Sequence, residues 1–385
     1  MDRRINSPAL ALGICSLLIP VLLALGSCWA MKSVDAPRAV AVIAVAETGT
    51  QSPLGVPAGM GAALAFASGD GATLFDVQRV DTRSDNAAAA QAAAMAAKGA
   101  SIAVGFTDSD PALAAAPAFT KRGVPVVVIG ATDPALPARC GPGTFLACFG
   151  DDAQAIAGAE FGAARFGKRA AVIFDSRRDY TRTLAGFFRT HLGSKLGGSA
   201  VAEFDLASVA APAIAPHLLE MSKDIDFVYV ALQPEQVADV LKSVRSALPS
   251  TPIVGGDGLD FDGVLQVAGA PASGVYYTTH AWLGQGASPE AAAFAASYAK
   301  ANAGMQPTAF SALGYDAAML AVDARRRAGS DAPAAIAAAL AATRDFRGVT
   351  GTISYANGPV PAKDVWVIEV KAGTRSLAQR WSPGR

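Results

Sequence analysis

The hydrophobic pattern of the chain is a repeated alternation of short apolar runs and longer helical stretches. Residues 39–46 (AVAVIAVA) have the length and composition of a buried parallel strand. The next stretch, 52–67, has Pro53 in its first turn and is predicted to be a helix. Further strands are predicted at 73–81, 101–105, 124–129, 169–174, 200–205, 226–231, 252–256, 274–279, 349–355 and 365–371. Further helices are predicted at 87–98, 111–120, 152–166, 180–196, 213–222, 234–247, 289–301, 309–327 and 331–341.

This alternation predicts an α/β fold. Consecutive strand–helix–strand units form right-handed crossovers and build doubly wound parallel sheets. The predicted strands are too many for one open sheet, so we expect two Rossmann-like lobes. Ligands bind at the carboxyl ends of the strands in such sheets, and between two lobes the binding site is a cleft.

Composition and charge narrow the function classes. The chain has 385 residues, of which 52% are hydrophobic and 17% charged, which excludes a disordered protein. Its 32 basic and 32 acidic residues cancel, so the chain has no basic excess with which to bind nucleic acid electrostatically.

The first 30 residues have the layout of a secretory signal peptide. Arg3 and Arg4 precede an apolar run over 9–26, and small residues follow. The sequence Leu-Gly-Ser-Cys ending at Cys28 is similar to a bacterial lipobox, in which Cys28 is lipidated. Cleavage after Ala30 and a retained membrane anchor are the alternatives.

Two cysteines of the mature chain lie close together in sequence. Cys140 and Cys148 are separated by a short loop, and in an oxidising compartment we expect them to form a disulfide. Metal binding is not expected there, because the spacing is wrong for a CxxC site and no histidine is near.

The sequence lacks recognisable catalytic motifs. It contains neither a GxSxG elbow nor a GxxxxGK[ST] loop, and its three histidines fit no metal spacing. We therefore expect no enzyme activity, no cofactor and no metal, and favour capture of a small molecule. A hydrolase whose catalytic groups meet only in the folded chain is the competing interpretation.

Several short motifs, in order, resemble those of one family. They are Thr48-Gly49 to Leu54-Gly55, Val80-Asp81 to Asp85, Val104-Gly105 to Ser109, Val124-Pro125 to Leu136, Phe310 to Ala317, and Phe346 to Gly351. Their order and spacing resemble those of the type I periplasmic binding proteins of the leucine/isoleucine/valine-binding kind, the solute receptors of ABC importers. The resemblance covers residues 39–373.

The resemblance implies ligand-binding roles on the first lobe. Ser109 matches a position that holds a ligand carboxylate with its hydroxyl and backbone N–H, and the alternative is a helix-capping serine. Gly130, Ala131 and Thr132 match the segment that holds the carboxylate and ammonium, and the alternative for Thr132 is an ordinary loop residue. Phe310 matches a pocket wall, for which core packing is the alternative.

Further roles are implied on the second lobe. Asp257 matches an acidic residue that faces the α-ammonium, although Gly-Gly-Asp-Gly is also a good turn sequence. Tyr180 matches an aromatic residue that closes over the ligand, with packing on the surface as the alternative. The chain departs from the family at Leu54, where leucine receptors carry an aromatic residue, and at 231–234, where a tyrosine is more usual. These departures leave the side-chain preference open.

The resemblance also implies an organisation and a function. One lobe is expected to comprise residues 37–149 and 279–349, and the other 150–278 and 350–385, with the crossing segments as a multi-strand hinge. The implied function is a monomeric periplasmic receptor that closes on a branched-chain or related amino acid and delivers it to an ABC permease. The alternatives are a ligand-sensing or envelope-regulatory lipoprotein, and a receptor for an amide or an aromatic acid.

Overall fold

The computed structural model describes residues 38–264, 273–371 and 373–384. The predicted signal peptide and the predicted lipidation site at Cys28 lie outside the described residues. Within them, no helix combines the length and the apolar character needed to cross a membrane.

The first sheet contains five parallel strands built from the first third of the chain. Its strand order is β2 (Phe75–Asp81), β1 (Ala39–Val45), β3 (Ile102–Gly105), β4 (Val126–Val128) and β5 (Thr144–Leu146). The central strands are almost entirely buried, as expected for apolar runs covered by helices on both faces. The helices of this region are α2 (Ser52–Phe66), α3 (Asp70–Leu74), α4 (Asn86–Ala96), α5 (Ser109–Thr120) and α6 (Leu136–Cys140).

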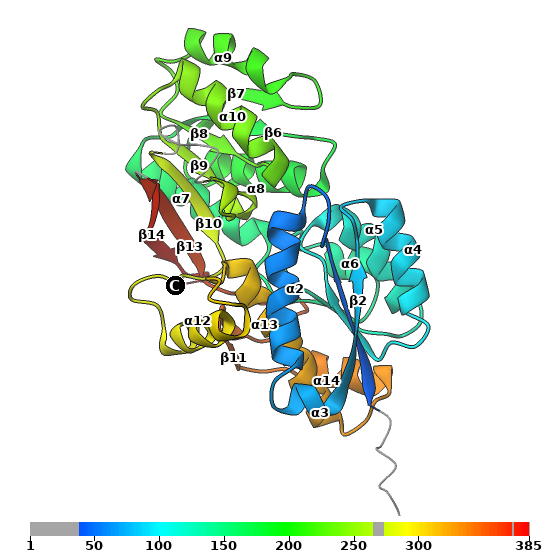
Figure 1. Cartoon of the computed structure of the whole chain (residues 1–385). Helices are drawn as coiled ribbons and strands as arrows, with labels where there is room; N and C mark the ends of the chain where they lie inside the picture. The colour runs from blue at the N-terminus through cyan, green and yellow to red at the C-terminus, as the bar shows by residue number, and fades with distance from the viewer. Residues whose placement is uncertain (1–37, 265–272, 372, 385) are drawn as a thin grey trace, which may run out of the picture. The chain divides into compact units, whose positions relative to one another are not determined.

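Helix α13 (Ala309–Ala328) returns late in the chain to pack on this first sheet. It contacts β3 and β4 and lies beside α2, as Figure 1 shows. The two helices approach closely through glycines: a Cβ on Gly61 would lie 1.9 Å from the Ser311 carbonyl oxygen, and one on Gly314 would lie 2.0 Å from the Ala58 carbonyl oxygen. Larger residues at either glycine would therefore force these helices apart.

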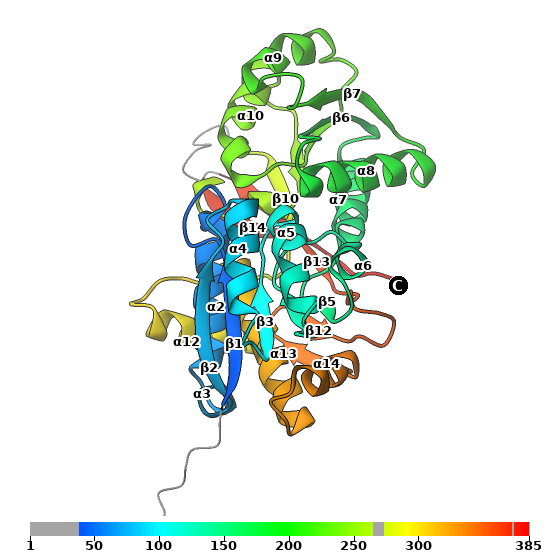
Figure 2. The ribbon, with the colours of Figure 1, turned by 90° about the vertical axis from the view of Figure 1, so that its right-hand side faces the viewer.

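The second sheet has seven strands and is mixed. Its order is β14 (Thr374–Trp381), β13 (Val365–Lys371), β10 (Val275–Thr279), β9 (Ile253–Gly255), β8 (Phe227–Val230), β6 (Arg169–Phe174) and β7 (Ser199–Asp205). Five neighbouring strands run parallel to one another: β10, β9, β8, β6 and β7. Strand β13 pairs antiparallel with both β10 and β14. The helices of this region are α7 (Asp151–Arg165), α8 (Asp179–Ser194), α9 (Ala211–Glu220), α10 (Pro234–Ala247) and the short 3-10 helix η1 (Asp257–Leu259). Figure 2 shows α7 and α8, which contact each other, and likewise α4 and α5 of the first region.

The chain passes between the two sheets three times. It leaves the first sheet after β5, returns after β10 through α12 (Pro289–Ala301) to α13, and crosses back before β13. Helix α14 (Pro333–Ala341) and a small hairpin, β11 (Phe346–Gly348) with β12 (Gly351–Ile353), precede the last crossing. The exact lobe boundaries given above stay predictions.

Most elements lie close to the ranges predicted from the sequence, with a few differences. The predicted strand 349–355 is shortened to β12, which pairs in a hairpin with β11. The elements β11, α3, α6, η1, β5 and β14 were not predicted. The N-cap of helix α4 is Asp85, whose Oδ1 accepts a hydrogen bond from the Ala88 N–H at 2.7 Å.

The predicted disulfide is wrong for this structure, because Cys140 and Cys148 are both free and buried thiols. The residues between them are not a closed turn: they include β5, an extended strand paired with β4. The Cys140 thiol donates to the Ala112 carbonyl oxygen at 3.6 Å, and the Cys148 thiol donates to the Ala131 carbonyl oxygen at 3.4 Å. Burial raises the pKa of Cys140 to about 11, which keeps that thiol protonated.

Candidate functional site

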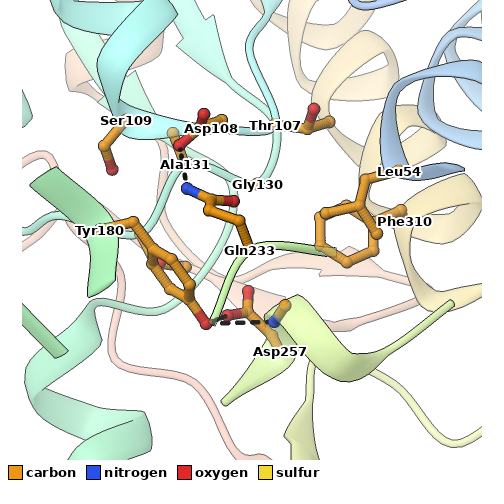
Figure 3. A pocket seen from close by; sticks show the side chains of 12 residues that line it. Leu54, Thr107, Asp108, Ser109, Gly130, Ala131, Tyr180, Gln233, Asp257 and Phe310 are labelled. Atoms are coloured by element: carbon orange, nitrogen blue, oxygen red, sulfur yellow. Dashed lines mark hydrogen bonds between the residues drawn. The ribbon is translucent and has the colours of Figure 1, made fainter. Parts of the chain in front are cut away.

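A cavity lies where loops from the carboxyl ends of strands in both sheets meet. Its lining residues surround about 240 Å³ of space, part of which is open to solvent. All eight residues predicted to bind the ligand line it: Leu54, Ser109, Gly130, Ala131, Thr132, Tyr180, Asp257 and Phe310. Four more lining residues were not predicted: Thr107, Asp108, Gln233 and Gly258. Figure 3 shows this arrangement.

The loop after β3 is turned into the cavity by an unusual backbone conformation. Phe106 has a φ of 67° although it is a bulky, non-glycine residue that is 1% exposed. Its carbonyl oxygen accepts hydrogen bonds from the N–H groups of Gly130 (3.0 Å) and Ala131 (3.3 Å), which tie this loop to the one after β4. The turn delivers Thr107, Asp108 and Ser109 to the wall of the cavity.

Ser109 is the first residue of α5 and is completely buried. No described group forms a hydrogen bond with its hydroxyl oxygen. The first N–H groups of a helix also lack partners within the helix, and the helix dipole favours negative charge at that end. The hydroxyl and these N–H groups therefore form a region suited to an anion such as a carboxylate.

A chain of buried hydrogen bonds links the loop after β4 to the loop after β9. The Thr132 hydroxyl donates to Asp151 Oδ1 at 2.7 Å. Gln154 Nε2 donates to Asp151 Oδ1 at 2.8 Å and to Asp257 Oδ1 at 3.0 Å. Burial raises the pKa of Asp151 well above its usual range. Gln154 thus fixes the relative positions of two acidic residues from different elements.

Asp257, in η1, is 2% exposed and held by three side chains. Its Oδ1 accepts from the Tyr180 hydroxyl at 2.7 Å and from Gln154, and its Oδ2 contacts His280 Nε2 at 2.8 Å. The Tyr180 hydroxyl in turn accepts from the Gly258 N–H at 3.1 Å. Burial, first of all, and the neighbouring Asp257 raise the pKa of Tyr180, so its hydroxyl keeps its proton. This wall of the cavity presents a fixed carboxylate, suited to a cationic group.

The remaining walls are apolar and tightly packed. Leu54 is 3% exposed and Phe310 is 1% exposed, and both face the cavity. Gly130 passes close beneath the Phe310 ring: a Cβ at Gly130 would lie 2.8 Å from Phe310 Cε1. The absence of a side chain at Gly130 therefore sets how near the ring comes to the backbone of the loop after β4.

Two of the unpredicted residues, Asp108 and Gln233, close the cavity with contacts between the two sets of elements. Gln233, at the start of α10, donates from Nε2 to Asp108 Oδ1 at 3.0 Å and accepts from Gln51 Nε2 at 2.9 Å. Arg178 Nη2 donates to Asp108 Oδ2 at 2.9 Å. Burial raises the pKa of Asp108 to about 6, although the nearby Arg178 opposes this shift.

These contacts leave little freely accessible space. The enclosed space between the cavity walls is about what one water molecule requires. A solute larger than water can therefore reach the cavity only if its walls move apart.

The sequence offered a partial signal for the residues that were missed. Asp108 adjoins Ser109, and Gln233 follows β8 at the same edge of the second sheet as the loop carrying Asp257. His280 is one of the three histidines that fit no metal spacing in the sequence, yet it contacts Asp257 and stacks on Phe149 with ring centroids 3.9 Å apart. Among the described residues, no group of three or more His, Cys, Asp or Glu side chains is arranged to hold a metal ion.

Comparison with known proteins gives consistent matches over most of the chain. A profile described as periplasmic binding protein matches residues 40–375. The leucine-binding protein LivK from Thermotoga maritima is 30% identical with a TM-score of 0.81, over 90% of this chain and 99% of that one. The branched-chain amino acid transporter substrate-binding protein LivJ from Streptococcus pneumoniae, solved with isoleucine, is 26% identical with a TM-score of 0.80, over 90% and 99%.

More distant structures share the fold and differ in their ligands. An ABC transporter solute-binding protein from R. palustris, solved with benzoate, is 20% identical with a TM-score of 0.78, over 90% of this chain and 97% of that one. A search among curated protein sequences gave no significant match. The profile match and the relative at 30% identity show that this chain belongs to the periplasmic binding protein family, with the type I fold of the solute-binding proteins of ABC transporters.

Proposed function

We propose that this protein is the extracytoplasmic substrate-binding component of an ABC importer and that it captures a small amino acid in the cavity described above. The observation that carries this proposal is the pairing of two opposite chemistries across one small cavity. Ser109 offers an unpartnered hydroxyl at a helix N-terminus, and Asp257 offers a buried carboxylate on another wall.

The first lobe binds the carboxylate of the ligand. The Ser109 hydroxyl and the N–H groups at the start of α5 donate to it, and the helix dipole stabilises the negative charge. Gly130 and Ala131 form the adjoining backbone wall, while the Thr132 hydroxyl, which already donates to Asp151, can accept from the ammonium.

The second lobe binds the ammonium group. Asp257 accepts a charge-assisted hydrogen bond from it, which is shorter and roughly twice as strong as a neutral one. Tyr180 and Gln154 hold the Asp257 carboxylate in place before the ligand arrives, so binding does not have to order this side chain. Leu54 and Phe310 cover the aliphatic part of the ligand.

Capture requires hinge motion between the lobes. The small accessible space indicates that the ligand enters an open form, in which the contacts of Asp108 with Arg178 and Gln233 are separated. The ligand then holds the two lobes around itself, because it can contact both Ser109 and Asp257 only when both lobes lie against it. The leader that precedes Cys28 directs export to the periplasm, and a lipid is attached to Cys28. The closed monomer docks on the permease.

Isothermal titration calorimetry on the mature protein with the common amino acids tests this proposal. We expect Ser109→Ala and Asp257→Asn each to weaken binding of the amino acid by tenfold or more, because each leaves one end of the zwitterion without its partner. Asp239→Asn, on the exposed side of α10, is the matched control and leaves affinity unchanged. Binding that is confined to ligands without an ammonium group, and indifferent to Asp257→Asn, contradicts the proposal.

One observation favours a second candidate, a receptor for an aromatic carboxylate. The carboxylate-binding half of the cavity does not depend on Asp257, and an R. palustris relative of the same fold was solved with benzoate. In this case benzoate raises the melting temperature of the protein more than any amino acid does.

A further inference from the structure

We propose that Asp108 and Gln233 select the ligand by its side chain, and that the preferred ligand is a small amino acid bearing a neutral amide or hydroxyl group rather than an aliphatic one. This inference rests on the proposed function, because it assumes that an amino acid occupies the cavity.

Two polar residues occupy a wall of the cavity that is not needed for the charged ends of an amino acid. Asp108 is 4% exposed and Gln233 is 2% exposed, and both line the cavity. Figure 3 shows the Gln233 amide directed at the Asp108 carboxylate, which it reaches at 3.0 Å. Thr107, which is 7% exposed, adds a hydroxyl to the same wall.

These residues are positioned by contacts outside the cavity. The Gln233 backbone N–H donates to Gln236 Oε1 at 2.9 Å, which fixes the start of α10. Gln51 Nε2 donates to Gln233 Oε1 at 2.9 Å and to Glu235 Oε2 at 3.2 Å. The amide of Gln233 is therefore held in one orientation, as a recognition group must be.

The pair retains hydrogen-bonding capacity that a ligand can use. A carboxylate has about four lone-pair sites, and Asp108 uses one on each oxygen, for Gln233 and for Arg178. The Gln233 Nε2 has two hydrogens and donates one of them to Asp108. A ligand amide or hydroxyl, which both donates and accepts, matches these free acceptors and this free donor.

Other ligand classes match this wall less well. An aliphatic side chain would remove water from Asp108 and Gln233 without replacing its hydrogen bonds, and sites built for hydrogen bonding discriminate strongly against such analogues. A cationic side chain would find the Asp108 carboxylate already paired with Arg178, whose guanidinium would repel it. A neutral polar side chain avoids both penalties, and Leu54 and Phe310 still accommodate its methylene groups.

Calorimetric titration with glutamine, asparagine, serine, threonine, leucine, isoleucine, valine and lysine tests the inference. We expect the best polar ligand to bind about tenfold or more tightly than the best aliphatic one, and lysine to bind weakly. Gln233→Leu should reduce this preference about tenfold, while Gln91→Leu, the same change on the exposed face of α4, leaves it unchanged.

The outcomes separate this inference from the proposed function. Leucine, isoleucine or valine binding as tightly as the polar ligands overturns the selection by Asp108 and Gln233, and leaves the amino acid receptor intact. A preference unaltered by Gln233→Leu also overturns it. If no amino acid binds while benzoate does, the proposed function fails, and this inference fails with it.

Discussion

Replacing Asp108 by asparagine tests whether this carboxyl is enclosed in solution as it is in the structure. Burial raises the pKa of Asp108 from an ordinary 3.8 to about 6, which corresponds to about 3 kcal/mol of unfolding free energy. Between these two values, the folded protein keeps a proton that the unfolded chain has released. The contribution of Asp108 to stability is therefore complete below about pH 4 and is lost as the pH rises through 6.

The Asp108→Asn variant has no such titration. Its free energy of unfolding relative to the wild type should therefore increase by up to about 3 kcal/mol between pH 4 and pH 7.5. Asparagine has only one carbonyl oxygen, so Arg178 or Gln233 loses an acceptor. Because asparagine does not titrate, this loss adds an offset to the free energy of unfolding that is nearly the same at every pH.

Urea unfolding followed by tryptophan fluorescence at several pH values measures this difference. Asp239→Asn, which removes an exposed carboxyl from α10, is the control. A difference between wild type and Asp108→Asn that is constant from pH 4 to pH 7.5 would refute the reasoning. It would mean that Asp108 is solvated in the dominant form in solution, and that the lobes are open in the absence of ligand.

Three further predictions concern groups around the cavity and between the lobes. Tyr180→Phe removes a hydroxyl that donates to Asp257 and accepts from the Gly258 N–H. The change should lower the free energy of unfolding by about 1–3 kcal/mol in urea titrations, and an unchanged unfolding midpoint would contradict this. Lys363 is 3% exposed and donates to the Ala147 carbonyl oxygen at 2.8 Å. Burial lowers the pKa of Lys363 to about 8, and the charge of the buried Asp316 opposes this shift. Lys363→Met should destabilise by about 3–5 kcal/mol in urea titrations, because it leaves the buried Asp316 carboxylate without a compensating charge; an unchanged midpoint would show that the two charges are not coupled. Finally, thiol reagents should label the mature protein at Cys140 and Cys148 only after unfolding, and a reductant should leave its melting temperature unchanged. A lower melting temperature in the presence of the reductant would support the predicted disulfide instead.

The sequence predicts most of this fold because its central strands are buried on both faces. Such strands are continuous apolar runs, and the runs at β1, β6 and β8 coincide closely with the observed strands. The edge strand β14 was missed because its sequence, TRSLAQRW, is polar and largely exposed, and is stabilised only by pairing with β13. Strand β11 was missed because it is short and only partly buried, and the predicted strand 349–355 began too early because it included the turn that joins β11 to β12.

The residues of the candidate site were accessible to sequence reasoning only in part. The eight residues expected to bind the ligand, Ser109 and Asp257 among them, all line one cavity, although their roles stay predictions. Asp108 and Gln233 were missed because their orientation depends on the left-handed turn at Phe106 and on contacts with Gln51, more than 180 residues from Gln233 in the chain. The disulfide prediction was wrong for a similar reason: proximity in sequence says nothing of the strand that separates two thiols.

The C-terminal pair of strands has a consequence for biogenesis. Strand β10 receives its second neighbour only from β13, with Thr279 opposite Trp366, so one edge of its sheet stays unsatisfied until nearly the whole polypeptide has been delivered. A chain emerging from a translocation channel would therefore complete this half last. Loss of the final two strands by a premature stop or by proteolysis would expose that edge to pairing with other molecules, which is a route to aggregation.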